Sequence, residues 1–140
     1  SDHRLEFHEG RVYAMTGASL RHNRIVGNLR AGLMALAGEG PCQVYAQAVK
    51  LHIHGCVFYP DVMVVCVPHD QLAHHVTAPC LVVEVVSPST DAGDRYGRKL
   101  RLYRRTASVR TYLVVEQERR AVTRHWRDAA GAPWQVETIE

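Results

Sequence analysis

Two carboxylates stand within runs of apolar residues, where an ionised side chain is costly to bury. Asp61 lies in the run 59–67, and Glu84 lies in the run 81–86. Both runs are rich in β-branched residues and are bounded by proline or serine, which is typical of buried β-strands. A buried carboxylate without a cationic partner costs several kcal/mol. These strands therefore require a cation, either a metal ion or a lysine, between their acidic side chains.

The spacing within the two runs indicates what kind of cation this is. Side chains alternate between the faces of a strand, so Asp61 shares a face with Met63 and Glu84 shares a face with Val82. If the strands pair, both carboxylates converge at one edge of the sheet. Two hard oxygen ligands suit Mg²⁺ or Mn²⁺. Such an ion activates a water and neutralises charge on a phosphate, as phosphodiester hydrolysis requires.

A basic segment follows the Glu84 strand and predicts a helix over residues 93–105. Lys99 lies where it can point back over the end of that strand and assist the attacking water, and Tyr103 follows one turn later on the same face. The segment 95–115 has no acidic residue, and such a cluster can contact phosphates. A solvated helix face is the alternative interpretation. The basic residues are Arg95, Arg98, Lys99, Arg101, Arg104, Arg105 and Arg110.

The remaining pattern predicts a layered fold. Ser19 is a suitable N-cap for a helix that ends near residue 37, and Glu9-Gly10 is a suitable hairpin turn. We expect a first hairpin over 5–14, a strand over 43–54, a last hairpin over 111–127 and a short strand over 134–139. This order predicts a mixed β-sheet flanked by helices, of the α/β or α+β class, as one domain over residues 1–140.

Composition excludes few function classes. The chain is 46% hydrophobic and 22% charged, as in ordinary globular proteins. No apolar stretch approaches the roughly 20 residues of a membrane span, and the first residues contain no signal-peptide core. We therefore expect a cytoplasmic protein that does not bind membranes.

The four cysteines form no Cys-x-x-Cys pair, so we expect buried, reduced thiols at Cys42, Cys56, Cys66 and Cys80. A disulfide or a zinc cage is the alternative. The two histidines of the segment His52-Ile-His54 alternate on a predicted strand and could bind zinc as a pair. No nearby pair of histidines or thiols completes a four-ligand set, so a zinc-dependent protein is a secondary hypothesis.

Motifs spread along nearly the whole chain carry a family resemblance. The most specific are Tyr-Pro-Asp-Val at 59–62 and Leu-Val-Val-Glu-Val-Val-Ser-Pro-Ser-Thr at 81–90. Together they resemble the Uma-two family of restriction endonucleases, within the PD-(D/E)xK nuclease superfamily. The resemblance implies a restriction-endonuclease-like fold and a Mg²⁺- or Mn²⁺-dependent endonuclease. The other matching pieces are residues 6–10, His22-Asn23, Asp94-Arg95, Lys99 with Tyr103, and residues 112–115.

The resemblance also implies roles for single residues. Asp61 and Glu84 resemble the metal-binding acidic pair, and the backbone carbonyl of Val85 resembles the third ligand. Lys99 resembles a catalytic lysine that has moved from the strand to the helix. The usual strand position of that lysine, two residues after the glutamate, holds Val86.

Two further residues join the candidate site through the same resemblance. Glu6 resembles an acidic residue with a supporting role in metal or water binding, and its alternative is an exposed hairpin residue. His22 matches a histidine that faces the active site, and its alternative is a core histidine.

The resemblance further implies partners. We expect nucleic acid, and DNA in particular, as the substrate, although no pattern of side chains specifies base readout. A homodimer is expected because each subunit of such an enzyme cuts one strand; Trp126 and Trp134 could serve its interface or the core. The main alternative is a catalytically inactive nucleic-acid-binding or assembly module of the same fold. Two departures from the family pattern favour that alternative. The segment from Asp94 to Lys99 is one residue longer than the usual spacing to the lysine, and Ala48 stands where similar sequences often carry an acidic residue.

Overall fold

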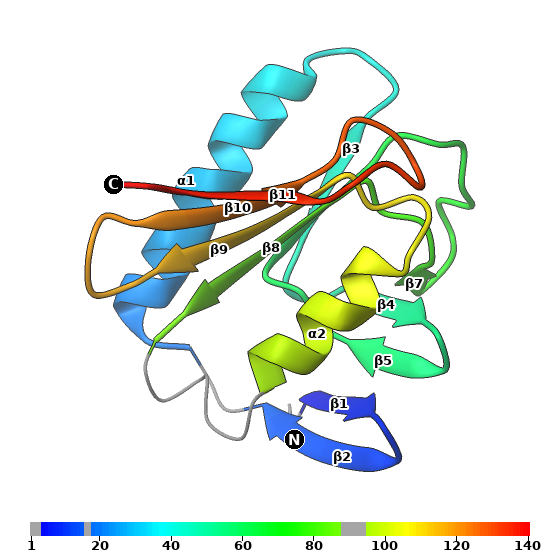
Figure 1. Cartoon of the computed structure of the whole chain (residues 1–140), viewed down its shortest axis with the longest axis horizontal. Helices are drawn as coiled ribbons and strands as arrows, with labels where there is room; N and C mark the ends of the chain where they lie inside the picture. The colour runs from blue at the N-terminus through cyan, green and yellow to red at the C-terminus, as the bar shows by residue number, and fades with distance from the viewer. Residues whose placement is uncertain (1–3, 16–17, 88–94) are drawn as a thin grey trace.

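Two mixed β-sheets and two α-helices make up the described residues, 4–15, 18–87 and 95–140, of the computed structural model (Figure 1). The helices are α1 (Leu20–Ala37) and α2 (Arg95–Arg104). The strands are β1 (Arg4–His8), β2 (Arg11–Met15), β3 (Gln43–Ala46), β4 (Lys50–Ile53), β5 (Cys56–Phe58), β6 (Val62–Val65), β7 (His75–Val76), β8 (Leu81–Val86), β9 (Thr111–Glu116), β10 (Val122–Trp126) and β11 (Gln135–Ile139).

The larger sheet has the order β11-β10-β9-β8-β6-β3 and carries both acidic strands at its centre. Strand β8 pairs antiparallel with β6 and parallel with β9. Val62 lies opposite Val83 in this register, so Asp61, just before β6, falls opposite Glu84. The expected pairing of the two acidic strands therefore occurs.

The smaller sheet has the order β2-β1-β5-β4-β7. Strand β1 pairs antiparallel with both β2 and β5, which brings the N-terminal hairpin beneath the central strands and α2 (Figure 1). The α+β class is confirmed, but the strands form two sheets where we expected one.

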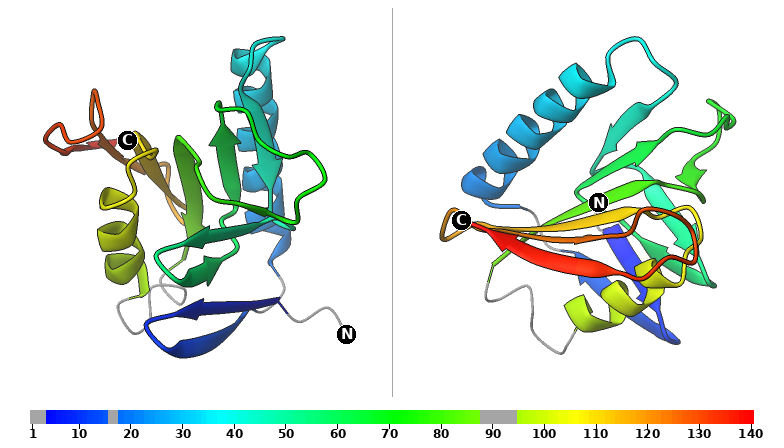
Figure 2. Two further views of the ribbon diagram at one scale, coloured as in Figure 1. Left: turned by 90° about the vertical axis from the view of Figure 1, so that its right-hand side faces the viewer. Right: turned by 45° about the horizontal axis from the view of Figure 1, so that its top comes forward.

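The helices cover opposite faces of the larger sheet (Figure 2). Helix α1 begins as predicted, because the side chain of Ser19 accepts a hydrogen bond from the His22 amide at 3.1 Å. It ends at Gly38, whose φ of 55° and amide bond to the Met34 carbonyl close the last turn. Val26 anchors α1 in an apolar cluster with valines of β6 and β8.

The second helix packs over the other face, between the two sheets. Leu102 and Tyr103 join an apolar cluster that includes Phe58 of β5, Met63 of β6 and Tyr112 of β9. This cluster fixes α2 beside the end of β8, which is where the sequence placed Lys99.

The predicted strand 43–54 is broken at Gln47. Gln47 has a φ of 50°, a left-handed conformation that strands do not contain. Its amide donates to the Asp61 carbonyl at 3.2 Å, and the next amide donates to the Ala46 carbonyl at 2.7 Å. The chain turns there, so β3 stays in the larger sheet and β4 joins the smaller one. Local propensity does not predict this turn because it depends on the contact with Asp61.

The prediction of four buried, reduced thiols was wrong for Cys42 and Cys66, and Cys80 is reduced but only partly buried. Cys42 and Cys66 form a disulfide, whereas Cys56 and Cys80 are free thiols. Gln43 lies opposite Val65 in the pairing of β3 with β6, so the residues just beyond this pair face each other. The sequence alone did not reveal that these strands are neighbours.

Some predictions fall on residues outside the described ranges. They concern the start of the basic helix at residue 93, the Pro-Ser-Thr segment 88–90, and Asp94. Within the described ranges, neither helix has the length and apolar character that crossing a membrane requires.

Candidate active site

Asp61 lies between α1 and β8. Its Oδ2 accepts a hydrogen bond from the Val85 amide at 2.7 Å, and its Oδ1 lies 3.1 Å from His22 Nε2. Both side chains are mostly buried. The N-cap at Ser19 sets where α1 begins, so it also sets where His22, in the first turn, meets Asp61. The predicted site residues His22 and Asp61 are therefore in direct contact.

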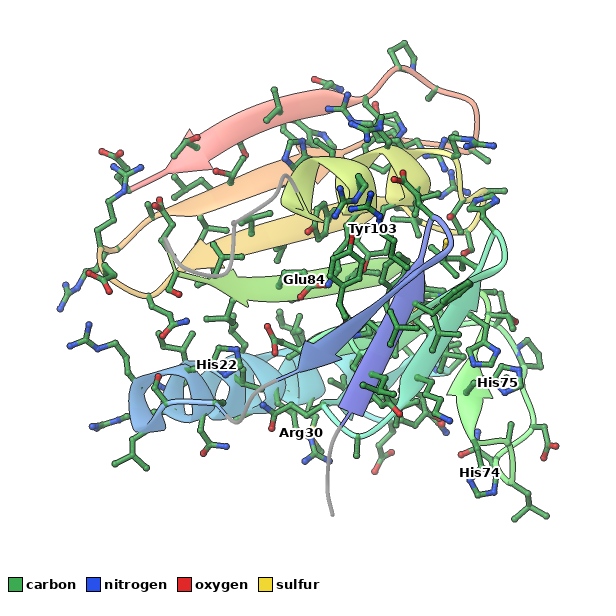
Figure 3. All side chains as sticks on the ribbon, turned by 90° about the horizontal axis from the view of Figure 1, so that it is seen from below. His22, Arg30, His74, His75, Glu84 and Tyr103 are labelled. Atoms are coloured by element: carbon green, nitrogen blue, oxygen red, sulfur yellow. A yellow bond between two sulfur atoms is a disulfide. The ribbon has the colours of Figure 1, made fainter. Side chains whose placement is uncertain are left out.

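Glu84 faces α2 from the central strand β8. Its Oε1 accepts hydrogen bonds from Lys99 Nζ and from the Tyr103 hydroxyl, each at 3.2 Å. Residues 99 and 103 are one helical turn apart, so both side chains reach the same carboxylate. In Figure 3, Glu84 lies between His22 on one side and Tyr103 on the other.

Glu6 is fully buried, so the alternative of an exposed hairpin residue is wrong. Its Oε1 lies 3.0 Å from Lys99 Nζ, and its Oε2 accepts a hydrogen bond from the Tyr59 amide at 2.8 Å. The pairing of β1 with β5 positions this side chain. Lys99 is therefore held between two carboxylates, Glu6 and Glu84.

Burial and like charges make Glu84 a weak acid for its type. Burial raises the pKa of Glu84 to about 7; the charges of Asp61 and Glu6 raise it too, and Lys99 partly opposes the shift. Three carboxylates, those of Asp61, Glu84 and Glu6, thus lie close enough to interact around one lysine.

The two basic side chains of the site respond to the same carboxylates. The hydrogen bond to Asp61 raises the pKa of His22, partly offset by burial. Burial lowers the pKa of Lys99, but the charges of Glu84 and Glu6 outweigh it, and the net shift is upward. Both shifts favour the protonated forms, so Lys99 is a cation and not a general base at neutral pH.

The donor set fits a small hard cation better than a soft one. Asp61 and Glu84 offer carboxylate oxygens on adjacent strands, and Glu84 Oε2 makes no hydrogen bond within the described part of the chain. Mg²⁺ needs only one or two protein carboxylates because it keeps several waters. Residues 4–15, 18–87 and 95–140 contain no group of three or more His, Cys, Asp or Glu side chains placed to hold a metal ion. The metal ligation by Asp61, Glu84 and the Val85 carbonyl stays a prediction.

The two histidines considered as a zinc pair in the secondary hypothesis, His52 and His54, are separated. The His52 ring stacks on the His75 ring, with 4.2 Å between centroids. His54 Nε2 instead lies 3.1 Å from the Thr106 hydroxyl. The two side chains therefore have different neighbours.

Some arginines of the basic helix α2 make contacts within the protein. The Arg98 guanidinium donates to the Tyr13 hydroxyl at 2.7 Å and lies 3.6 Å from a Glu9 carboxylate oxygen, which ties α2 to the first hairpin. Arg104 lies 5.9 Å from the Trp134 ring centroid. Arg101 and Arg105 are exposed, so both are open to contact with a phosphate backbone.

The sequence did not identify every residue around the site. Phe58 supports Lys99, whose Nζ lies 5.3 Å from the ring centroid, and the Tyr59 amide holds Glu6. Neither contact has a sequence signal, because the first depends on α2 packing against β5 and the second on β1 pairing with β5. Trp134 packs on the core beside α2 and donates to the Arg104 carbonyl at 3.3 Å.

Comparison with known proteins places this geometry in context. The Uma2 family model, described as "Putative restriction endonuclease", matches residues 1–140. Two uncharacterized proteins of Synechocystis sp. (strain ATCC 27184 / PCC 6803 / Kazusa) are similar: slr1290 is 40% identical over 113 residues and sll1609 is 33% identical over 119 residues. These matches cover 79% and 80% of this chain but 59% and 66% of the relatives, so the chain spans less than two thirds of their length.

A solved structure shares the fold. It is the crystal structure of "a putative nuclease belonging to DUF820" from Anabaena variabilis ATCC 29413, and it matches with a TM-score of 0.75 over 94% of this chain and 75% of that chain. The sequence identity is 12%, so this likeness concerns the fold alone.

Proposed function

This chain belongs to the Uma2 family, as its motifs predicted, and from that premise we propose that it is a metal-dependent endonuclease that hydrolyses phosphodiester bonds, with DNA as the substrate. Family and fold support a restriction-endonuclease-like nuclease. The observation that carries the finer proposal is the position of Lys99, buried between Glu6 and Glu84, the latter on strand β8, which pairs with the strand following Asp61.

In this proposal Asp61, Glu84 and the Val85 carbonyl hold Mg²⁺ or Mn²⁺. The ion, when bound, lowers the pKa of a bound water and neutralises charge on the phosphate. The gathering of three carboxylates, Asp61, Glu84 and Glu6, around one lysine supports a further cation there.

The remaining site residues position the reacting groups and stabilise the negative charge on the phosphate. Lys99 donates to the attacking water and to the developing negative charge on the phosphate. Glu6, held by the Tyr59 amide, keeps the ammonium group at the end of β8. His22 holds Asp61 from the opposite side. Arg101 and Arg105 bind the nucleic acid backbone, which gives binding that weakens with salt.

A nicking assay tests the proposal. Supercoiled plasmid is incubated with Mg²⁺ or Mn²⁺ and with wild-type protein, Asp61→Ala or the matched control Asp70→Ala. Asp70 lies in an exposed loop, where its side chain bonds the Leu72 amide. We expect nicking by the wild type and the control and none by Asp61→Ala. Equal nicking by wild type and Asp61→Ala, or none with either divalent ion, contradicts the enzyme.

A second candidate function is a nucleic-acid-binding or assembly module that has lost activity. Val86, which occupies the usual strand position of the lysine, favours it. This module binds DNA in a salt-dependent manner, and its binding is unchanged in Asp61→Ala. This candidate function is excluded if the wild type nicks the plasmid and Asp61→Ala does not.

The expected homodimer is part of the proposal, because a single site cuts one strand of a duplex. Light scattering coupled to size-exclusion chromatography measures the mass in solution. A mass of twice the 15.7 kDa chain supports the dimer. A monomeric protein that nicks just one strand contradicts it.

A further inference from the structure

We propose that Tyr103 is a positioning residue for Glu84, one that orients the carboxylate so that Oε2 remains available to a divalent ion. This inference rests on the proposed function and deepens it, since it assigns to α2 a second residue that serves the site. Tyr103 does not touch the substrate or the metal in this proposal and acts only through Glu84.

Two donors converge on one oxygen of Glu84. The Tyr103 hydroxyl and Lys99 Nζ each lie 3.2 Å from Oε1. Oε2 makes no hydrogen bond to any residue that the structure describes. A carboxylate held through one oxygen presents the other in a fixed direction. The arrangement therefore separates a structural oxygen, Oε1, from an oxygen that can bind a cation, Oε2.

The tyrosine is the more rigid of the two donors. Its side chain is fully buried, and its ring packs edge-on against Tyr112 at 4.7 Å and against Phe58 at 6.0 Å between centroids. Lys99 has a flexible four-carbon side chain and is also shared with Glu6. When Lys99 turns toward a phosphate, Tyr103 is the donor that still holds Glu84. Figure 3 shows Tyr103 beside Glu84 at this position.

Core packing alone does not account for this hydroxyl. The ring fills space between the two sheets, and phenylalanine fills nearly the same volume. The hydroxyl adds one contact, a hydrogen bond to the Glu84 carboxylate at 3.2 Å. A purely structural tyrosine affects folding stability, whereas a positioning tyrosine affects how tightly the folded protein binds a divalent ion.

The test measures Mn²⁺ binding by titration calorimetry on the full chain, without nucleic acid. It compares wild type with Tyr103→Phe and with Tyr45→Phe, a matched control whose hydroxyl bonds Gln43 and His69 away from the site. Urea unfolding identifies conditions in which all three proteins are folded. We expect affinity to fall about tenfold or more in Tyr103→Phe and to stay unchanged in Tyr45→Phe. Wild-type affinity in folded Tyr103→Phe overturns the inference and leaves the proposed function standing.

The other outcomes also have a single meaning. A wild type that binds no Mn²⁺, or binds it equally after Asp61→Ala, overturns the metal site of the proposed function and this inference with it. If Tyr103→Phe does not fold, the wild type is labelled with 3-fluorotyrosine and its six tyrosine resonances are assigned from the other five variants. We expect the Tyr103 resonance to shift when Mg²⁺ is added, and an unmoved resonance at saturation overturns the inference.

Discussion

Replacing Lys99 by methionine removes the cation between two buried carboxylates and should destabilise the metal-free protein severely. Glu6 is 0% exposed and Glu84 is 8% exposed, so neither can regain its lost partner from water. Removing one member of a buried ion pair costs about 3–5 kcal/mol. That is a large part of the roughly 5–15 kcal/mol by which a domain is stable. Methionine keeps most of the side-chain volume, so the loss reports charge and not a cavity.

The loss of stability in Lys99→Met should depend on pH, because the Glu84 carboxylate can take up a proton. The pKa of Glu84 is raised from 4.5 to about 7 in the folded wild type. Because the pKa of Glu84 is higher in the folded than in the unfolded chain, its contribution to the free energy of unfolding is fully present below pH 4.5. That contribution is lost as the pH rises through 7. This amounts to about 3 kcal/mol, at 1.36 kcal/mol for each pKa unit. Lys99 lowers the pKa of Glu84, so its removal makes the fall with pH steeper.

Urea unfolding at pH 5 and pH 8, with a chelator present, measures this difference. The matched control is Lys50→Met, which changes the other lysine of the chain, an exposed residue of β4. We expect Lys99→Met to lose about 3–5 kcal/mol at pH 8 and clearly less at pH 5, while Lys50→Met changes little at either. A loss below about 1 kcal/mol at pH 8, the upper end of what exposed pairs contribute, or an equal loss at both pH values, would show that Lys99 does not compensate a buried charge here.

Three other measurements examine separate parts of the account. In metal-free protein, Glu84→Gln should flatten the fall of unfolding free energy between pH 4.5 and 7, and a slope equal to that of the wild type contradicts the burial of this charge. Alkylation of the unfolded, unreduced chain should label two of the four cysteines, and mass mapping that finds Cys42 and Cys66 labelled argues against their disulfide. The double change Arg101→Ala and Arg105→Ala should lower the slope of log affinity against log salt for DNA by about 2, and an unchanged slope shows that these arginines do not meet the backbone.

The sequence predicted the parts of the site that lie on its central elements. Asp61 and Glu84 stand out because carboxylates are rare in apolar β-branched runs. Lys99 could be assigned because a helix that directly follows a strand returns over the end of that strand. These inferences use neighbours that are close in the sequence or are separated by one regular element.

What escaped prediction depends on pairings between distant segments. The burial of Glu6 results from β1 pairing with β5, some 50 residues later. The disulfide results from β3 pairing with β6, and the break at Gln47 results from its bond to the Asp61 carbonyl. None of these pairings has a local signal, since side-chain alternation specifies a strand but not its partner.

Anomalous diffraction from crystals soaked in Mn²⁺ determines whether Asp61 and Glu84 share a divalent ion, on which the proposed nuclease depends. We expect one strong anomalous peak about 2.1 Å from an oxygen of each carboxylate, with Glu84 contributing Oε2 and with Tyr103 still bound to Oε1. Crystals at saturating Mn²⁺ with no peak between the two residues, and with the contacts of His22 to Asp61 and of Lys99 to Glu84 unchanged, would contradict it.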